Sequence, residues 1–206
     1  MLDTCRTAAR QRWRRDGAFY QEVMPWSGPP VLSAADANAA YHRNLVEPRF
    51  SFCSHIQSSG TEIAWMFYRR YAYLRDEAWL RDHAYPMMRE MALYYLDAFA
   101  KGDDGKYHIV PTNTHEAFWG VKDGIMDLAA VRWLLPKVIE TSARLDTDGY
   151  CERCVAPAEA PGRTGARDVV ARLGGRVEEE HQNGAFYAAL LTLPFSEGPR
   201  PVGFIC

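Results

Sequence analysis

The chain has 206 residues, of which 48% are hydrophobic, and its 24 Lys and Arg residues against 26 Asp and Glu give a net charge of -2. A chain of this size can bury a sizeable core in one or two domains. The balance of charge provides no basic face, which excludes most nucleic-acid binders. No apolar run approaches the roughly 20 residues that span a bilayer, so no membrane partner is expected.

The N-terminal sequence MLDTCRTAARQRWRRD lacks the apolar segment of a signal peptide, so a cytoplasmic protein is the default expectation. Only Cys151 and Cys154, among five cysteines, have the spacing of metal ligands. One such pair without a second is weak evidence for zinc. We therefore expect reduced thiols, no metal and no cofactor.

The first third of the chain alternates short helices with loops. Residues 4–15 and 34–44 are expected to be helical, and the second helix should end near Pro48. The intervening segment is interrupted by Pro25 and by the Gly-Pro-Pro run that starts at Gly28, which is typical of a loop.

Two longer helices are expected next. Ser59-Gly60-Thr61-Glu62 reads as a capping box for a helix over 59–74. Its apolar stripe comprises Ile63, Met66, Phe67, Tyr71 and Leu74. Asp76 is a good N-cap for a segment over 77–100, within which Pro86 should either kink the helix or restart it. The apolar stripe of that segment comprises Leu80, Ala84, Met88, Met91, Tyr95 and Phe99.

A turn at 101–106 leads to a long loop and then to a third helix that starts near Asp127 and runs to about residue 145, kinked at Pro136. No strand pattern is visible between residues 59 and 145. After residue 148 the composition shifts to Ala, Pro and Gly, which is typical of a linker. We therefore divide the chain into a domain over 1–148 and a tail of unknown role over 149–206.

More ionisable and aromatic residues than a connector requires occur in the loop at residues 108–127, HIVPTNTHEAFWGVKDGIMD. Two His, a Glu, an Asn, two Asp and a Trp fall within its twenty residues. Acid and base groups beside aromatic faces are common where sugars are cleaved. The histidine and carboxylate spacing matches no standard metal site.

Three segments in this order resemble the six-hairpin glycosidases. They are YRRYAYLRDEAWLRDHAYPMMREMALYYLDAF at 68–99, VPTNTHEAFW at 110–119 and GIMDLAAVRWLLPKVIETSARLDTD at 124–148. The similarity is greatest to glycoside hydrolase family 95, the α-L-fucosidase-like enzymes. It implies an all-α fold, an (α/α)6 toroid of helical hairpins with the active site in loops at one end.

Twelve helices with their loops need on the order of 350 residues, so the chain is expected to be a partial toroid. Half a toroid would expose apolar helix faces, which predicts self-association. The isolated chain is also expected to lack part of the substrate pocket.

The resemblance implies a role for Glu116. It falls where the family has the Glu of a Ser-Pro-Glu motif, its general acid, although this chain reads Thr-His-Glu there. The alternative for Glu116 is a solvated loop carboxylate. The resemblance also implies a later acidic residue that acts with the base, and none is recognisable after residue 148.

Several polar and aromatic residues are candidates for contact with the sugar. His115 and Asn113 could bond to hydroxyl groups, and Trp119 could stack on a ring or anchor the loop in the core. His55 and Gln57 precede an inner helix at its mouth end. Asp127 is a further candidate, with a helix N-cap as the alternative.

The sequence thus predicts a glycoside hydrolase that acts on an oligo- or polysaccharide, most like an inverting α-L-fucosidase. The alternative is a helical-hairpin module that binds carbohydrate, or is a remnant, without activity of its own. The absence of a recognisable second carboxyl keeps that alternative open.

Overall fold

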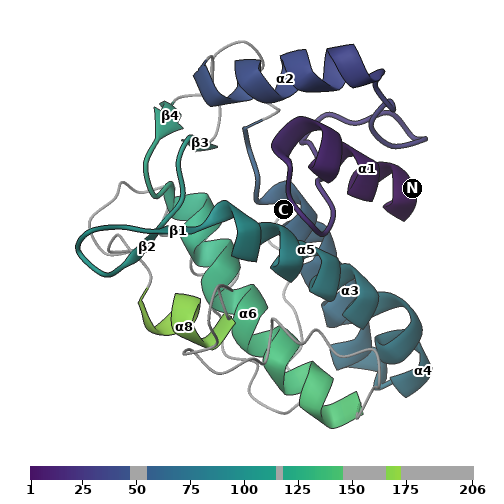
Figure 1. The fold of residues 1–206 in the computed structure, drawn as a ribbon. Coiled ribbons are helices and arrows are strands. Elements are labelled where there is room, and N and C mark those ends of the chain that lie inside the picture. The colour runs from purple at the N-terminus through teal and green to yellow at the C-terminus, as the bar shows by residue number, and fades with distance from the viewer. Residues whose placement is uncertain (47–54, 115–117, 146–165, 173–206) are drawn as a thin grey trace, which may run out of the picture.

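The computed structural model describes residues 1–46, 55–114, 118–145 and 166–172, and these are mostly helical (Figure 1). The predicted all-α class is confirmed. The α-helices are α1 (Leu2–Trp13), α2 (Ala34–Val46), α3 (Ser59–Leu74), α4 (Glu77–Trp79), α5 (Tyr85–Ala98), α6 (Ile125–Leu145) and α8 (Ala166–Ala171). None of these helices combines the length and apolar character needed to cross a membrane.

Helices α1 and α2 pack against each other beside the main bundle (Figure 1). Residue Arg14 ends α1 in the left-handed conformation, and the following turn places Gly17 against the backbone of α5. A Cβ at Gly17 would lie 2.1 Å from the carbonyl oxygen of Glu90, so only glycine allows this approach. The turn therefore fixes the α1–α2 pair against α5.

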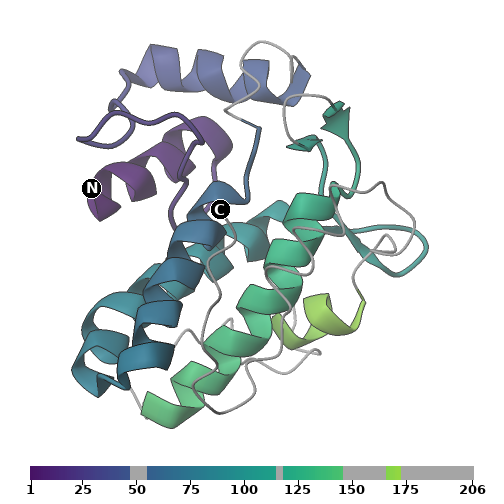
Figure 2. The same cartoon turned by 180° about the vertical axis from the view of Figure 1, so that it is seen from behind.

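Helices α3, α5 and α6 enclose the main hydrophobic core and are seen from behind in Figure 2. The predicted stripe of α5 and of the turn before it is confirmed, since all six of its residues are buried. The predicted stripe of α3 is wrong in part. Met66 and Leu74 are 57% and 62% exposed, whereas Tyr71 of the stripe is buried as predicted, together with Gly60, Thr61 and Ala64.

The turn between α3 and α5 follows the prediction closely. Asp76 caps α4 by accepting a hydrogen bond from the Trp79 amide at 3.0 Å. A π-helical turn, η2 (Leu80–Ala84), then leads into α5, where Pro86 occupies the first turn. Because proline has no N–H, the wider turn before it accommodates the missing hydrogen bond. The proposed capping box differs, since Ser58 precedes α3 and makes no side-chain cap.

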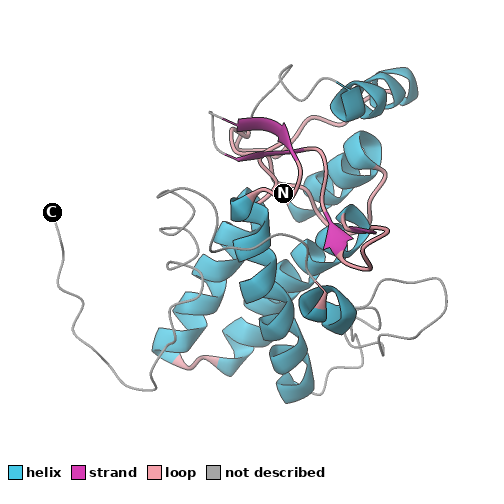
Figure 3. Cartoon of the chain, turned by 90° about the vertical axis from the view of Figure 1, so that its left-hand side faces the viewer, coloured by secondary structure: helices cyan, strands magenta, loops and turns pink. Residues whose placement is uncertain are grey.

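Four short strands lie between α5 and α6, where the sequence predicted none. They are β1 (Ala100–Lys101), β2 (Tyr107–His108), β3 (Thr112–Thr114) and β4 (Phe118–Val121). Each antiparallel pair, β1 with β2 and β3 with β4, forms a separate hairpin. Figure 3 shows both hairpins gathered towards one end of the helices. Strands of two to four residues are too short to give an alternating pattern.

Helix α6 runs without interruption through Pro136 and contacts α8. Ala166 and Val169 of α8 belong to the same core as α5 and α6. The Tyr107 amide also donates to the carbonyl oxygen of Arg172 at 2.7 Å. The segment 166–172 therefore packs against the helical bundle. The division at residue 148 and the complete toroid stay predictions.

Candidate active site

The hairpin of β3 and β4 carries the segment singled out in the sequence. Thr112 pairs with Val121 and Thr114 with Phe118, with an irregular register between the two pairs. His115 and Glu116 fall in the connection between the strands, outside the described residues. The two strands nevertheless fix both attachment points of that connection, because Thr114 and Phe118 are paired.

Asp127 ties this hairpin to two helices. The carboxylate, in the first turn of α6, is 1% exposed. Tyr95 of α5 donates its hydroxyl proton to one carboxylate oxygen at 2.7 Å, and Thr112 of β3 donates to the other. Burial raises the pKa of Asp127 to about 6, although both hydrogen bonds act to lower it. Strand β3 is thereby bonded to a carboxyl group in the bundle interior.

A glycine permits this close approach between β3 and the start of α6. A Cβ at Gly124 would lie 2.6 Å from the Thr114 hydroxyl and 3.0 Å from the Thr112 methyl group. The first of these distances is too short for any side chain without movement. The hairpin is therefore seated directly on the N-terminal end of α6.

The polar candidates from two distant segments are brought together around β3. The Asn113 amide donates to the carbonyl oxygen of His55 at 2.9 Å. The Gln57 side chain donates to the carbonyl oxygen of Pro111 at 3.1 Å. The side-chain oxygen of Asn113 accepts from the Gly120 amide at 2.8 Å, which crosses the hairpin. The segment before α3 is therefore hydrogen-bonded to β3 and to the residue that precedes it.

These candidates are buried in the structure. His55, Gln57 and Asn113 are each 1% exposed. The His55 ring also bonds through Nε2 to the carbonyl oxygen of Asn44 at 2.7 Å, which connects α2 to the same network. Their observed partners are protein groups, so in this arrangement they hold the loops in place. Their contact with a sugar stays a prediction.

Arg15 and Tyr94 complete the network, and sequence reasoning missed both. One Arg15 guanidinium nitrogen donates to the Gln57 side-chain oxygen at 2.6 Å and to the Tyr94 hydroxyl at 2.9 Å. Tyr94 in turn donates to the same Gln57 oxygen at 3.0 Å. The positive charge of Arg15 also helps to lower the pKa of buried Asp127. No local pattern indicates these contacts, since the partners lie 42 and 79 residues away.

Aromatic surface is exposed on β4 next to the connection that carries Glu116. Phe118 is 54% exposed and Trp119 is 41% exposed. Large aromatic rings that keep this much exposure can offer a face to a sugar ring, and they also lower the local polarity around a neighbouring carboxyl group. Trp119 is thus placed where it can stack, although a contact within the protein also holds it.

Two further carboxyl environments bear on the site. His108 contacts Asp123 at 2.5 Å and Asp104 at 3.1 Å, so its partners in the structure are two carboxylates of the same loop region. Glu62 of α3, read from the sequence as part of a capping box, is half-buried beside Ser58, and burial raises its pKa. Across the described residues, no group of three His, Cys, Asp or Glu side chains could hold a metal.

Comparison with known proteins now decides the family. The profile of the glycosyl hydrolase family 95 catalytic domain matches residues 40–160. The chain belongs to glycosyl hydrolase family 95. Its class of reaction is the hydrolysis of glycosidic bonds, and its substrate class is carbohydrate. A search of curated proteins finds no match.

The matched region of this family 95 chain contains every residue selected above as a candidate. It spans His55, Gln57, the whole β3–β4 hairpin and Asp127. The family match therefore covers the hairpin and its supports together, but leaves α1 and Arg15 outside it.

Proposed function

We propose that this family 95 protein cleaves an α-L-fucosidic bond with inversion, with Glu116 as the proton donor. The observation that carries the proposal is the anchoring of the β3–β4 hairpin, through Thr112, to the buried carboxyl group of Asp127. A catalytic group is most effective when rigid elements and secondary contacts hold it in place. Here the connection bearing Glu116 starts three residues after such a contact.

The acid must keep its proton near neutral pH in order to give it to the departing oxygen. A carboxyl group gains that property when apolar surface replaces water around it, as Phe118 and Trp119 can do on the same hairpin. Proton transfer from Glu116 to the leaving oxygen then accompanies cleavage of the bond to the anomeric carbon. A water molecule attacks that carbon from the opposite face and gives up a proton to the second carboxylate of an inverting pair, which acts as the base; the two carboxyl groups stand about 6.5–9.5 Å apart to leave room for the water.

The remaining candidates divide into two roles in this proposal. Trp119 stacks on the sugar ring, and His115 bonds to a hydroxyl group next to the proton donor. Asn113, Gln57 and His55 act mainly on the hairpin and its supports, because their hydrogen bonds in the structure go to protein groups. Asp127 likewise acts as a positioning residue, through Thr112.

The proposal is tested with a panel of aryl glycosides and the full-length protein. We expect turnover of the α-L-fucoside, with the β-anomer of fucose as the first product in NMR spectra. Glu116→Gln should reduce turnover by about 100-fold or more, since general acid catalysis supplies that much, while fucose binding is retained. Glu140→Gln is the matched control, because that carboxylate is exposed on α6 beside Lys137.

Two outcomes would contradict this assignment. If Glu116→Gln turns over the fucoside as fast as the parent protein, Glu116 is not the acid. If the parent binds fucose but cleaves no glycoside in the panel, the carbohydrate-binding module without activity becomes the better account.

A further inference from the structure

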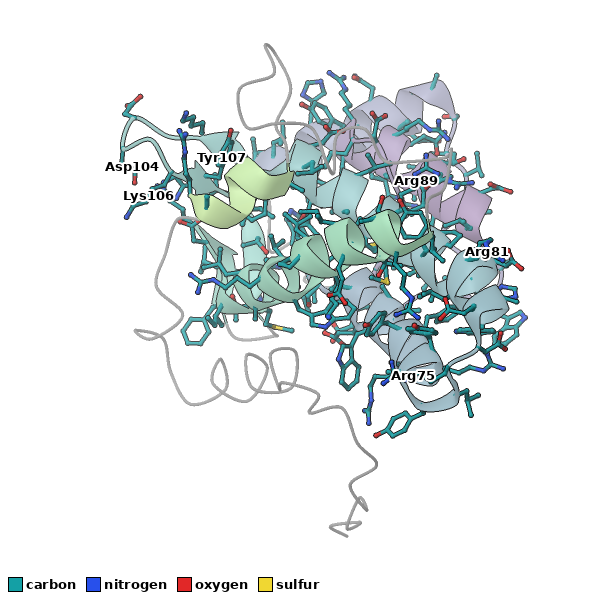
Figure 4. All side chains as sticks on the ribbon, turned by 90° about the horizontal axis from the view of Figure 1, so that it is seen from below. Arg75, Arg81, Arg89, Asp104, Lys106 and Tyr107 are labelled. Atoms are coloured by element: carbon teal, nitrogen blue, oxygen red, sulfur yellow. The ribbon has the colours of Figure 1, made fainter. Side chains whose placement is uncertain are left out.

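A charged pocket lies between α1 and α5, apart from the candidate active site. Its volume is about 270 Å³, and it is lined by Arg6, Arg10, Asp16, Gly17, Arg89, Glu90 and Leu93. Figure 4 shows Arg89 beside α1, seen from below. The pocket is smaller than the roughly 300–1,000 Å³ of typical ligand sites, which favours a small occupant.

The pocket faces away from the hairpin network. Arg89 and Leu93 are four residues apart and therefore share one side of α5. At 3.6 residues per turn, Tyr95, which bonds Asp127, lies on roughly the opposite side of the same helix. The pocket and the candidate active site are thus separated by the body of α5.

The charges that line the pocket are unevenly paired. Three arginines and two carboxylates line it, and Arg6 also pairs with Asp3, outside the lining, at 3.0 Å. Glu90, with a side chain 6% exposed, contacts Arg6 at 2.9 Å and Arg89 at 3.9 Å, so it is already engaged. The carboxylate of Asp16 is the remaining negative charge, on the exposed turn after α1.

Two arginines keep donor capacity for a ligand. Within the ranges the structure describes, Arg10 makes no side-chain hydrogen bond or ion pair and is exposed. The side chain of Arg89 is 37% exposed, and its contact with Glu90 at 3.9 Å is longer than a hydrogen bond, so its terminal nitrogens can donate to a ligand.

The geometry points to a second ligand site in this pocket, for a small molecule that carries an oxyanion group. The planar guanidinium groups of Arg10 and Arg89 bind the anion oxygens, as arginine does with carboxylate, sulfate or phosphate. Arg6 holds Glu90 and keeps that carboxylate out of the ligand position. The site does not depend on the proposed fucosidase activity, because no residue of the hairpin takes part.

The test is isothermal titration calorimetry on the full chain at constant ionic strength. Sulfate represents a free inorganic oxyanion and D-glucuronate an acidic sugar, with D-glucose as the neutral control. We expect saturable binding of at least one anion in the millimolar range and none of glucose. Preference for glucuronate over sulfate identifies an acidic sugar as the occupant, and the reverse identifies a free oxyanion.

Variants decide whether the pocket is the place of binding. Arg10→Ala and Arg89→Ala should each weaken the anion affinity about tenfold or more, the usual effect of losing a charge-assisted hydrogen bond. Arg81→Ala, at an exposed position outside the pocket, is the matched control. Arg10→Glu gives a second test at an exposed position, with circular dichroism as the check on folding.

Two results would overturn the inference. One is the absence of saturable binding of either anion to the parent protein. The other is binding that Arg10→Glu and Arg89→Ala leave unchanged, because the anion would then be held elsewhere.

Discussion

Replacement of Asp127 by asparagine should change how the stability of the protein depends on pH. Burial raises the pKa of this carboxyl group from 3.8 to about 6. The folded protein therefore binds a proton that the unfolded chain has already released in this interval. The stability associated with Asp127 is fully present below about pH 4 and is lost as the pH rises through 6.

The pKa shift of Asp127 sets the size of this loss of stability. A shift of about two pKa units, at roughly 1.4 kcal/mol each, corresponds to on the order of 3 kcal/mol. The amide side chain of the Asp127→Asn variant carries no charge at any of these pH values, so the variant does not lose this stability as the pH rises. The hydroxyl groups of Tyr95 and Thr112 can each donate or accept, which lets them rebond to an amide. The variant should therefore gain stability relative to the parent by about 3 kcal/mol between pH 4 and pH 7.

The assay is urea unfolding of both proteins at pH 4, 5, 6, 7 and 8, followed by tryptophan fluorescence. Titrations elsewhere in the chain are common to both proteins and cancel in the difference. A difference in the free energy of unfolding that stays constant within about 1 kcal/mol from pH 4 to pH 7 would refute the reasoning. Fucoside turnover by the variant should fall by up to about 100-fold, since a small misplacement of the acid is enough.

Three further predictions concern other contacts. Trp119→Ala should raise KM for the fucoside in steady-state kinetics with little change in melting temperature, because the residue is 41% exposed; an unchanged KM would remove it from the sugar site. The hydrogen bond to Asp123 raises the pKa of His108, so His108→Gln should cost stability below about pH 6.5 and progressively less as the pH rises through the folded-state value. A cost independent of pH in chemical denaturation would contradict that contact. Gly17→Ala should destabilise by about 1–3 kcal/mol or more, because its φ of 76° and the approach of Glu90 both oppose a side chain, and an unchanged melting curve would refute it.

The helical part of the fold was predictable where periodicity is strong. The stripe from Leu80 to Phe99 repeats every three or four residues, and all of it is buried. Asp76 and Pro86 act locally, so their effects on α4 and α5 could be read directly. The face of α3 was harder to predict, because aromatic residues occur on several sides and tertiary packing buries Tyr71 with three small residues.

The hairpin network was not predictable from local sequence. The bond from Tyr95 to Asp127 joins residues 32 apart, and that from Arg15 to Gln57 joins residues 42 apart. Asp127 was considered as a helix cap or a sugar contact, whereas its observed partners are two buried hydroxyl groups. Such roles depend on which helices pack together, and a single sequence does not specify that.

If Glu116 gives its proton to the departing oxygen, the effect of replacing it must depend on the leaving group. A strongly basic phenolate leaving group needs that proton in order to depart, whereas fluoride leaves without it. We expect Glu116→Gln to lower kcat/KM for 4-methoxyphenyl α-L-fucoside by about 100-fold or more and for α-L-fucosyl fluoride by less than about tenfold. An equal loss on both substrates, or no loss on either, would contradict it.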